Sequence, residues 1–73
     1  MSVQELSDAE VWERWKALDR DRELAATTLG DTRVWDAAIT THGGNAIVLD
    51  AIEQPTPEAA MRSVLAQLEE RES

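Results

Sequence analysis

The fold is decided by residues 34–52, which read VWDAAITTHGGNAIVLDAI. Apolar side chains alternate with others on both sides of the Gly43-Gly44 pair, and a period of two is typical of β-strands. The sequence therefore predicts two strands, at about residues 33–40 and 46–52, which form an antiparallel hairpin.

The length of the turn determines which side chains share a face of this hairpin. A two-residue Gly43-Gly44 loop would set Ala37 opposite Asp50 and mix charge into the apolar face. We expect a loop of three residues or of five, because a slip of one residue exchanges the two faces. The apolar face then holds Trp35, Ala37, Ile39, Ile47, Leu49 and Ala51. On the other face, Asp36 is expected directly opposite Asp50.

Helix signals lie on either side of the hairpin. Ser7-Asp8-Ala9-Glu10 has the spacing of a capping box, and apolar residues recur at three and four from Val11 onward. This pattern predicts a helix over about residues 8–26. Thr56-Pro57-Glu58 combines a cap residue, a first-turn proline and an acid, so a second helix is expected over about residues 57–70.

The predicted order of elements is helix, strand, strand, helix. It defines a small α+β domain, αββα, with both helices packed on one face of the antiparallel β-hairpin. The chain has 73 residues, enough for one domain with a thin core. The other face of the hairpin is half apolar, so we expect either a homodimer or a partner to cover it.

Charge is the strongest feature of the composition. The net charge is −8 and there is no cysteine, so a disulfide framework is excluded and a reducing, cytoplasmic compartment is expected. No signal peptide and no membrane-spanning run is recognisable. Direct binding to nucleic acid or to an anionic membrane is disfavoured, whereas a basic protein partner suits the charge. Solubility alone is the simpler reading of the same charge.

The sequence contains no recognisable catalytic or metal-binding pattern. His42 is the only histidine, which leaves no Cys-His pair and no His-rich zinc site. Gly43-Gly44 lies between strands and does not open a helix, so it indicates a turn and not a phosphate-binding loop. We therefore expect no enzyme activity, no metal and no cofactor.

A partner-binding surface is the remaining candidate site. Two aspartates on the face without helices, together with neighbouring acids, would present negative charge to a basic protein. Trp12, at the edge of the apolar stripe of the first helix, is a candidate interface anchor. The predicted partner-binding residues are Asp36, Asp50, Glu53, Asp31 and Trp12.

Residues 34–68 resemble the phage ABA sandwich domain family. The resemblance rests on Trp35 with Asp36, on the strand at residues 46–52, and on the stretch EQPTPEAAMR at residues 53–62. The chain departs from the family in a less aromatic first segment and in having two clear strands. The resemblance implies a phage or prophage origin, an αββα fold, and a small accessory protein that acts on a host factor.

Two hypotheses about function follow. The first is a small acidic protein that binds and inhibits another protein, for example a phage-encoded, anti-CRISPR-like inhibitor that presents carboxylates in place of phosphates. The second is an antitoxin-like or adaptor protein that acts as a homodimer through apolar surfaces.

Overall fold

The computed structural model describes residues 2–72. The elements in chain order are η1 (Val3–Glu5, a 3-10 turn), α1 (Asp8–Lys16), β1 (Arg22–Leu29), β2 (Thr32–Thr40), β3 (Ile47–Gln54) and α2 (Pro57–Glu72). The strands form one antiparallel sheet in the order β1-β2-β3.

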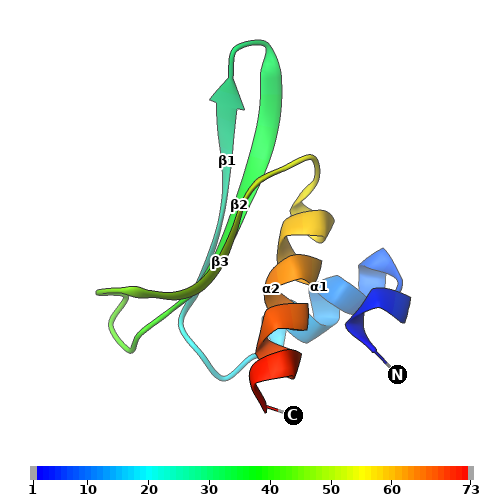
Figure 1. Cartoon of the computed structure of the whole chain (residues 1–73), viewed down its shortest axis with the longest axis vertical. Helices are drawn as coiled ribbons and strands as arrows, with labels where there is room; N and C mark the ends of the chain where they lie inside the picture. Colours follow the sequence, from blue (N-terminus) through cyan, green and yellow to red (C-terminus); the bar gives the residue numbers. More distant parts are fainter. Residues whose placement is uncertain (1, 73) are drawn as a thin grey trace.

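The molecule has two layers, with both helices on the same side of the sheet (Figure 1). Helix α2 packs directly against the strands, whereas α1 packs mainly against α2. The hairpin formed by β1 and β2 extends beyond the helices (Figure 1). The predicted α+β class is confirmed, and a third strand turns the expected αββα order into αβββα.

The prediction of a first helix over residues 8–26 is wrong. Helix α1 ends at Lys16, and residues 22–29 form β1, which pairs with β2 at eight consecutive positions from Arg22–Ile39 to Leu29–Thr32. The apolar spacing of this segment fits a helix, but Thr27 and Thr28 are β-branched and favour strands. Pairing with β2 satisfies the backbone of the whole segment, so tertiary structure overrides the local periodicity.

Arg22 supports the early end of α1. Its guanidinium donates hydrogen bonds to the carbonyl oxygens of Lys16 at 3.0 Å, Leu18 at 3.0 Å and Arg20 at 3.1 Å. The last carbonyls of a helix lack partners within the helix, and a cation is favourable at that end. Arg22 thus joins the end of α1 to the start of β1.

The two-residue turn Gly30-Asp31 connects β1 to β2. Leu29 pairs with Thr32, and Gly30 has a φ of 61°. A glycine with positive φ at the first central position is typical of a tight hairpin turn. Gly30 therefore begins a hairpin turn.

The faces of the β2–β3 hairpin are as predicted for Leu49 and Ala51, but the register is shifted. Ile47, which was expected on the apolar face, lies on the other face, and the expected loop of three or five residues is wrong because Thr40 pairs with Ile47. Ala37 pairs with Ala51, and Ile39 pairs with Leu49, so these residues share the face toward α2. Two irregularities explain the shift, because Thr40 pairs with Ile47 and Trp35 pairs with Gln54. The turn is therefore longer than expected. The extra residue of β3 between Ile47 and Leu49 forms a bulge, and after it Leu49 and Ala51 face the core.

The core lies between the sheet and the helices. Its largest fully buried side chains are Val11 from α1, Ile39 from β2, and Met61 and Val64 from α2. Trp15 is buried with them, as the apolar stripe predicted. This arrangement makes one face of the sheet the wall of the core and leaves the other face outside it.

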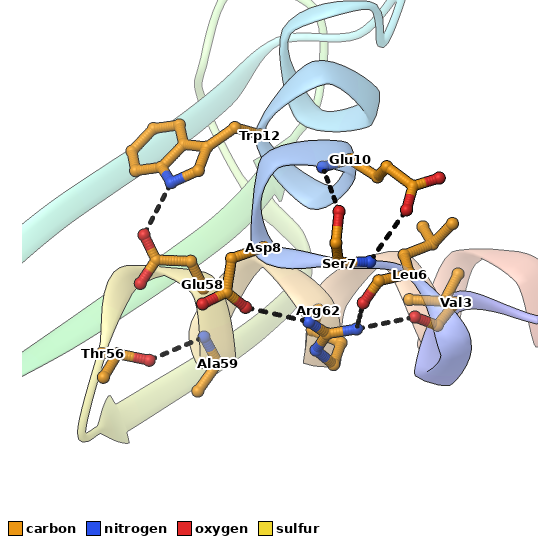
Figure 2. Close-up of polar contacts among 10 residues, drawn as sticks. All are labelled: Val3, Leu6, Ser7, Asp8, Glu10, Trp12, Thr56, Glu58, Ala59 and Arg62. Atoms are coloured by element: carbon orange, nitrogen blue, oxygen red, sulfur yellow. Dashed lines mark hydrogen bonds and ion pairs between the residues drawn. The ribbon is translucent and has the colours of Figure 1, made fainter.

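Polar contacts fasten the N-terminal segment and α1 onto α2 (Figure 2). The Arg62 guanidinium donates to the carbonyl oxygens of Val3 at 2.9 Å and Leu6 at 2.7 Å, and it lies 3.1 Å from the Asp8 carboxylate. The Trp12 indole N–H donates to the Glu58 carboxylate at 2.6 Å. These bonds fix the helical layer on one side of the molecule.

Both helix starts form as the sequence predicted. The Ser7 hydroxyl accepts from the Glu10 amide, and the Glu10 carboxylate accepts from the Ser7 amide (Figure 2). The Thr56 hydroxyl accepts from the Ala59 amide at 3.0 Å. These hydrogen bonds satisfy donors that a helix leaves unpaired at its N-terminus.

Replacement of Gly30 tests the β1–β2 turn. A Cβ at this position would meet no atom within 4 Å, so the cost of Gly30→Ala comes from the positive φ alone. We expect the variant to lower the free energy of unfolding by about 1–2 kcal/mol, measured by urea denaturation. Asp31→Ala, at the adjacent exposed position, is the control and should change it by less than about 0.5 kcal/mol. Equal effects of the two substitutions would contradict the turn.

The capping box at α1 predicts a titration shift. Hydrogen bonds from the Ser7 amide and hydroxyl hold the pKa of Glu10 below its ordinary value of 4.5. Because the folded pKa is lowered, the contribution of Glu10 to stability is present above pH 4.5 and is lost as the pH falls through the folded pKa.

An NMR titration of the Glu10 carboxyl carbon measures this shift. Ser7→Ala should raise the pKa of Glu10 toward its ordinary value, and the control Ser63→Ala, in α2, should leave it unchanged. A Glu10 pKa that does not respond to Ser7→Ala would show that the capping box does not form.

Candidate functional site

The sheet face turned away from both helices is the candidate site, and we call it the open face. Ala37 and Ile39 point into the core, so the alternate positions of β2 and their neighbours on β1 and β3 point the other way. The open face comprises Glu23, Ala25, Asp36, Ala38, Ile47, Asp50 and Ile52, all of which line one shallow hollow.

The cross-strand pairing places two carboxylates in one row. Ala38 pairs with Glu23 on β1 and with Asp50 on β3. The backbones of the two acids are therefore about 10 Å apart, twice the spacing between strands. Asp36 is two residues along β2 from Ala38 and pairs with Ala25, so it lies in the next row. Three carboxylates thus surround two alanines.

The small side chains create the hollow, and larger apolar ones border it. Its volume is about 200 Å³. Ile47 and Ile52 are 61% and 56% exposed, which is high for isoleucines in a strand. Isoleucine contributes more stability when it is removed from water, so these two side chains would gain from contact with a partner. The open face is thus apolar at its centre and acidic around it.

The carboxylates differ in their availability. Within residues 2–72, the side chains of Glu23 and Asp50 have no hydrogen-bond or ion-pair partner. Asp36 Oδ1 accepts the backbone N–H of Glu53 at 2.9 Å. Glu53 has a φ of 56°, in the left-handed region, and lies where the β2–β3 pairing is irregular. Asp36 therefore stabilises a bulge as well as contributing charge to the open face.

Among the described residues 2–72, no lysine or arginine lies beside these acids on the open face. Arg22 and Arg33 pair with Ile39 and Thr28, which places both at positions on the helix side of the sheet. The other five basic residues lie in the helices or in the segment between α1 and β1, and they are Arg14, Lys16, Arg20, Arg62 and Arg71. The open face therefore has an unbalanced negative charge.

The structure brings Asp36 and Asp50 to the same side of the sheet, as predicted. The expectation that they lie directly opposite each other is wrong, because Asp50 pairs with Ala38. The two irregularities in the β2–β3 pairing shift the register and set the aspartates on a diagonal. This offset lowers the repulsion that directly opposed like charges would cause.

Of the other three predicted partner-binding residues, one lies beside this pair and two lie away from it. Glu53 lies at the bulge beside Asp36. Asp31 is in the β1–β2 turn, at the tip of the hairpin and away from β3 (Figure 1). Trp12 is half-buried in the helical layer, packed against the core, with its N–H bound to Glu58 (Figure 2). Trp12 and the acids are therefore on opposite sides of the sheet.

Sequence reasoning missed Glu23, Ala25 and the bordering isoleucines as site residues. The helix expected over residues 8–26 includes Glu23 and Ala25, and this expectation keeps both out of the sheet. The dipeptide Gly30-Asp31 between residues 22–29 and 32–40 was the signal that could have found β1, because Gly-Asp is a common two-residue hairpin loop. With β1 in place, the face shared with Asp36 follows from the pairing.

Other kinds of site find little support in the described part of the chain. Residues 2–72 contain no group of three or more histidine and acidic side chains arranged to hold a metal ion. No helix within these residues combines the length and the apolar character needed to cross a membrane. Comparisons with protein-family models, with curated proteins and with solved structures found no match.

Substitution of Asp36 separates its two roles. Asp36→Ala removes the acceptor for the Glu53 amide, and we expect it to lower the free energy of unfolding by about 0.5–1.5 kcal/mol. Asp36→Asn retains an acceptor oxygen and should keep most of that stability while removing the charge. Asp50→Ala is the matched control without a hydrogen bond to lose. Urea denaturation of the three variants measures the difference, and equal stability of Asp36→Ala and Asp50→Ala would contradict the role at the bulge.

Proposed function

We propose that this chain is a non-enzymatic binding protein whose open face docks a basic segment of another protein. The observation that carries the proposal is the coincidence of three unneutralised carboxylates with exposed isoleucines around one hollow. Complementary charge would give specificity and a fast encounter, and apolar contact would add affinity.

The geometry of the open face suits lysine and arginine side chains. Each has a long apolar stem and a charged end, so the stem can cover apolar surface while the end reaches a carboxylate. On the open face the stem would lie over Ala38 and between the isoleucines. The charged end would then reach Glu23 or Asp50, which flank Ala38 in the same row.

The expected strength of binding follows from the exposure of the carboxylates and isoleucines to solvent. An ion pair on the surface contributes about 0.2–1 kcal/mol, so three carboxylates alone provide weak attachment. Burial of apolar surface adds about 25 cal/mol per Å². Burial of the two isoleucines would therefore contribute a free energy of binding comparable to that of the ion pairs. Binding should therefore weaken with salt without disappearing, since salt screens only the charged part.

We extend the proposal to inhibition of a nucleic-acid-binding protein. Such proteins gather lysine and arginine on the surface that contacts phosphates. The carboxylates of the open face would occupy that surface in place of phosphates. Together with the resemblance of residues 34–68 to a phage family, this leads us to propose a phage-encoded inhibitor of a host nucleic-acid-binding or defence complex in the cytoplasm.

An NMR titration with the synthetic peptide Ac-KLKVKL-NH2 tests the surface. The probe alternates basic and apolar residues, which is the chemistry that the open face should recognise. We expect amide shifts at positions 23–25, 36–38 and 47–52. Neutralising the two unpartnered acids together, Glu23→Gln with Asp50→Asn, should weaken binding about tenfold at low salt.

A matched double variant controls for net charge. Glu5→Gln with Glu13→Gln removes two exposed acids from the helical side of the molecule and should change affinity less than about twofold. Equal weakening by both double variants would mean that the peptide responds to total charge and not to the open face. Binding that ignores salt would instead favour the antitoxin-like or adaptor hypothesis, in which apolar surfaces carry association.

A further inference from the structure

The two edges of the sheet differ in how well they are protected. Both β1 and β3 are edge strands, since β2 lies between them. Strand β3 pairs irregularly at two places, contains Glu53 with positive φ, and packs against α2. Bulges and covering elements are the usual means by which proteins prevent a sheet edge from pairing with another chain.

Strand β1 has no irregularity in its pairing with β2 and contacts α2 less than β3 does. Its eight residues pair with β2 in unbroken register. The segment from Leu24 to Leu29 reads LAATTL, with no charged residue and no proline. All of it is exposed except Leu24, which is half-buried. A regularly paired edge segment without charge presents unpaired backbone groups along its length and is a ready partner for another strand.

We propose that β1 is a self-association edge, along which a second copy of this chain pairs antiparallel. The occupant follows from charge. A net charge of −8 makes two copies of the chain repel each other, but the segment 24–29 itself carries no charge. A basic segment, in contrast, would find no acid along this stretch.

Within residues 22–29, two-fold pairing of β1 places no like charges opposite each other. When a two-fold axis perpendicular to the sheet relates the two strands, opposite residues lie on the same face, so the axis must pass beside a single residue of each copy. Ala25 and Ala26 are the two residues at the middle of β1, and the pairing is expected to centre on one of them. Glu23 then lies opposite Thr27 or Leu29 of the second copy. The central side chains are alanines, which do not obstruct the approach of two backbones.

The alternative contact between copies, through the open face, is electrostatically unfavourable. Stacking two open faces would bring three carboxylates from each copy together with no lysine or arginine among them. Like charges that lose water repel strongly. Pairing through β1 avoids this contact and leaves both open faces exposed on the same side of a six-stranded sheet, so the dimer would offer two docking hollows.

Sedimentation velocity over a range of concentrations tests the proposal. A contact of one strand is small for a protein interface, so we expect a dimer at about 200 μM and a monomer at about 1 μM. Ala26→Lys and Ala26→Glu each place like charges opposite or diagonal to each other across the axis, and each variant alone should stay monomeric at about 200 μM. An equimolar mixture of the two should restore the dimer, because the opposed charges then attract.

Ile52→Lys is the matched control on the open face. It replaces an exposed apolar residue of β3 by the same charged side chain and should leave the dimer intact. Loss of the dimer in Ile52→Lys with retention in Ala26→Lys would overturn the proposal in favour of contact through the open face. Wild-type chain that remains monomeric at about 200 μM would overturn it as well. Circular dichroism of each variant confirms that it is folded.

Discussion

The pairing of β1 with β2 is the contact on which the rest of the structure depends. It converts residues 22–29 from a continuation of α1 into a strand, and it gives β2 a neighbour on each side. The same pairing brings Glu23 and Ala25 beside Ala38 and Asp36, which completes the open face. It also makes the uncharged segment 24–29 of β1 an edge of the sheet. Without it, the chain would be a two-stranded ribbon under two helices, and such a ribbon is marginally stable.

The sequence predicted the parts of the fold that local chemistry determines. The Ser7 capping box, the cap at Thr56, and most of the division of the β2–β3 hairpin into two faces follow from patterns of a few residues. Ile47 is the exception, because the irregular pairing puts it on the open face and not on the expected core face. Residues 22–29 could not be assigned in the same way, because their apolar spacing suits a helix and their threonines suit a strand. Pairing over eight positions decides between the two, and only the folded chain contains that contact. The irregular pairing that shifts Asp36 off Asp50 is likewise a tertiary contact, between β2 and β3, which no pattern of a few residues specifies.

Charge and burial are divided between the two sides of the sheet. On the helix side, Arg62 binds the N-terminal segment and Arg22 binds the end of α1, so those basic groups serve the fold. On the other side, acids outnumber bases and isoleucines are exposed. Its exposed isoleucines gain from leaving water, whereas its carboxylates would repel a second identical surface. This division explains why we assign the open face to a different, basic protein and the β1 edge to a copy of the chain.

The conformation of residues 22–29 in solution tests this account most directly. Backbone chemical shifts and cross-strand nuclear Overhauser effects from a uniformly labelled sample would determine it. The account predicts strand-type shifts over residues 22–29 and cross-strand contacts between residues 23–28 and 33–38. Helical shifts that continue from Asp8 through Ala26, without those contacts, would contradict it.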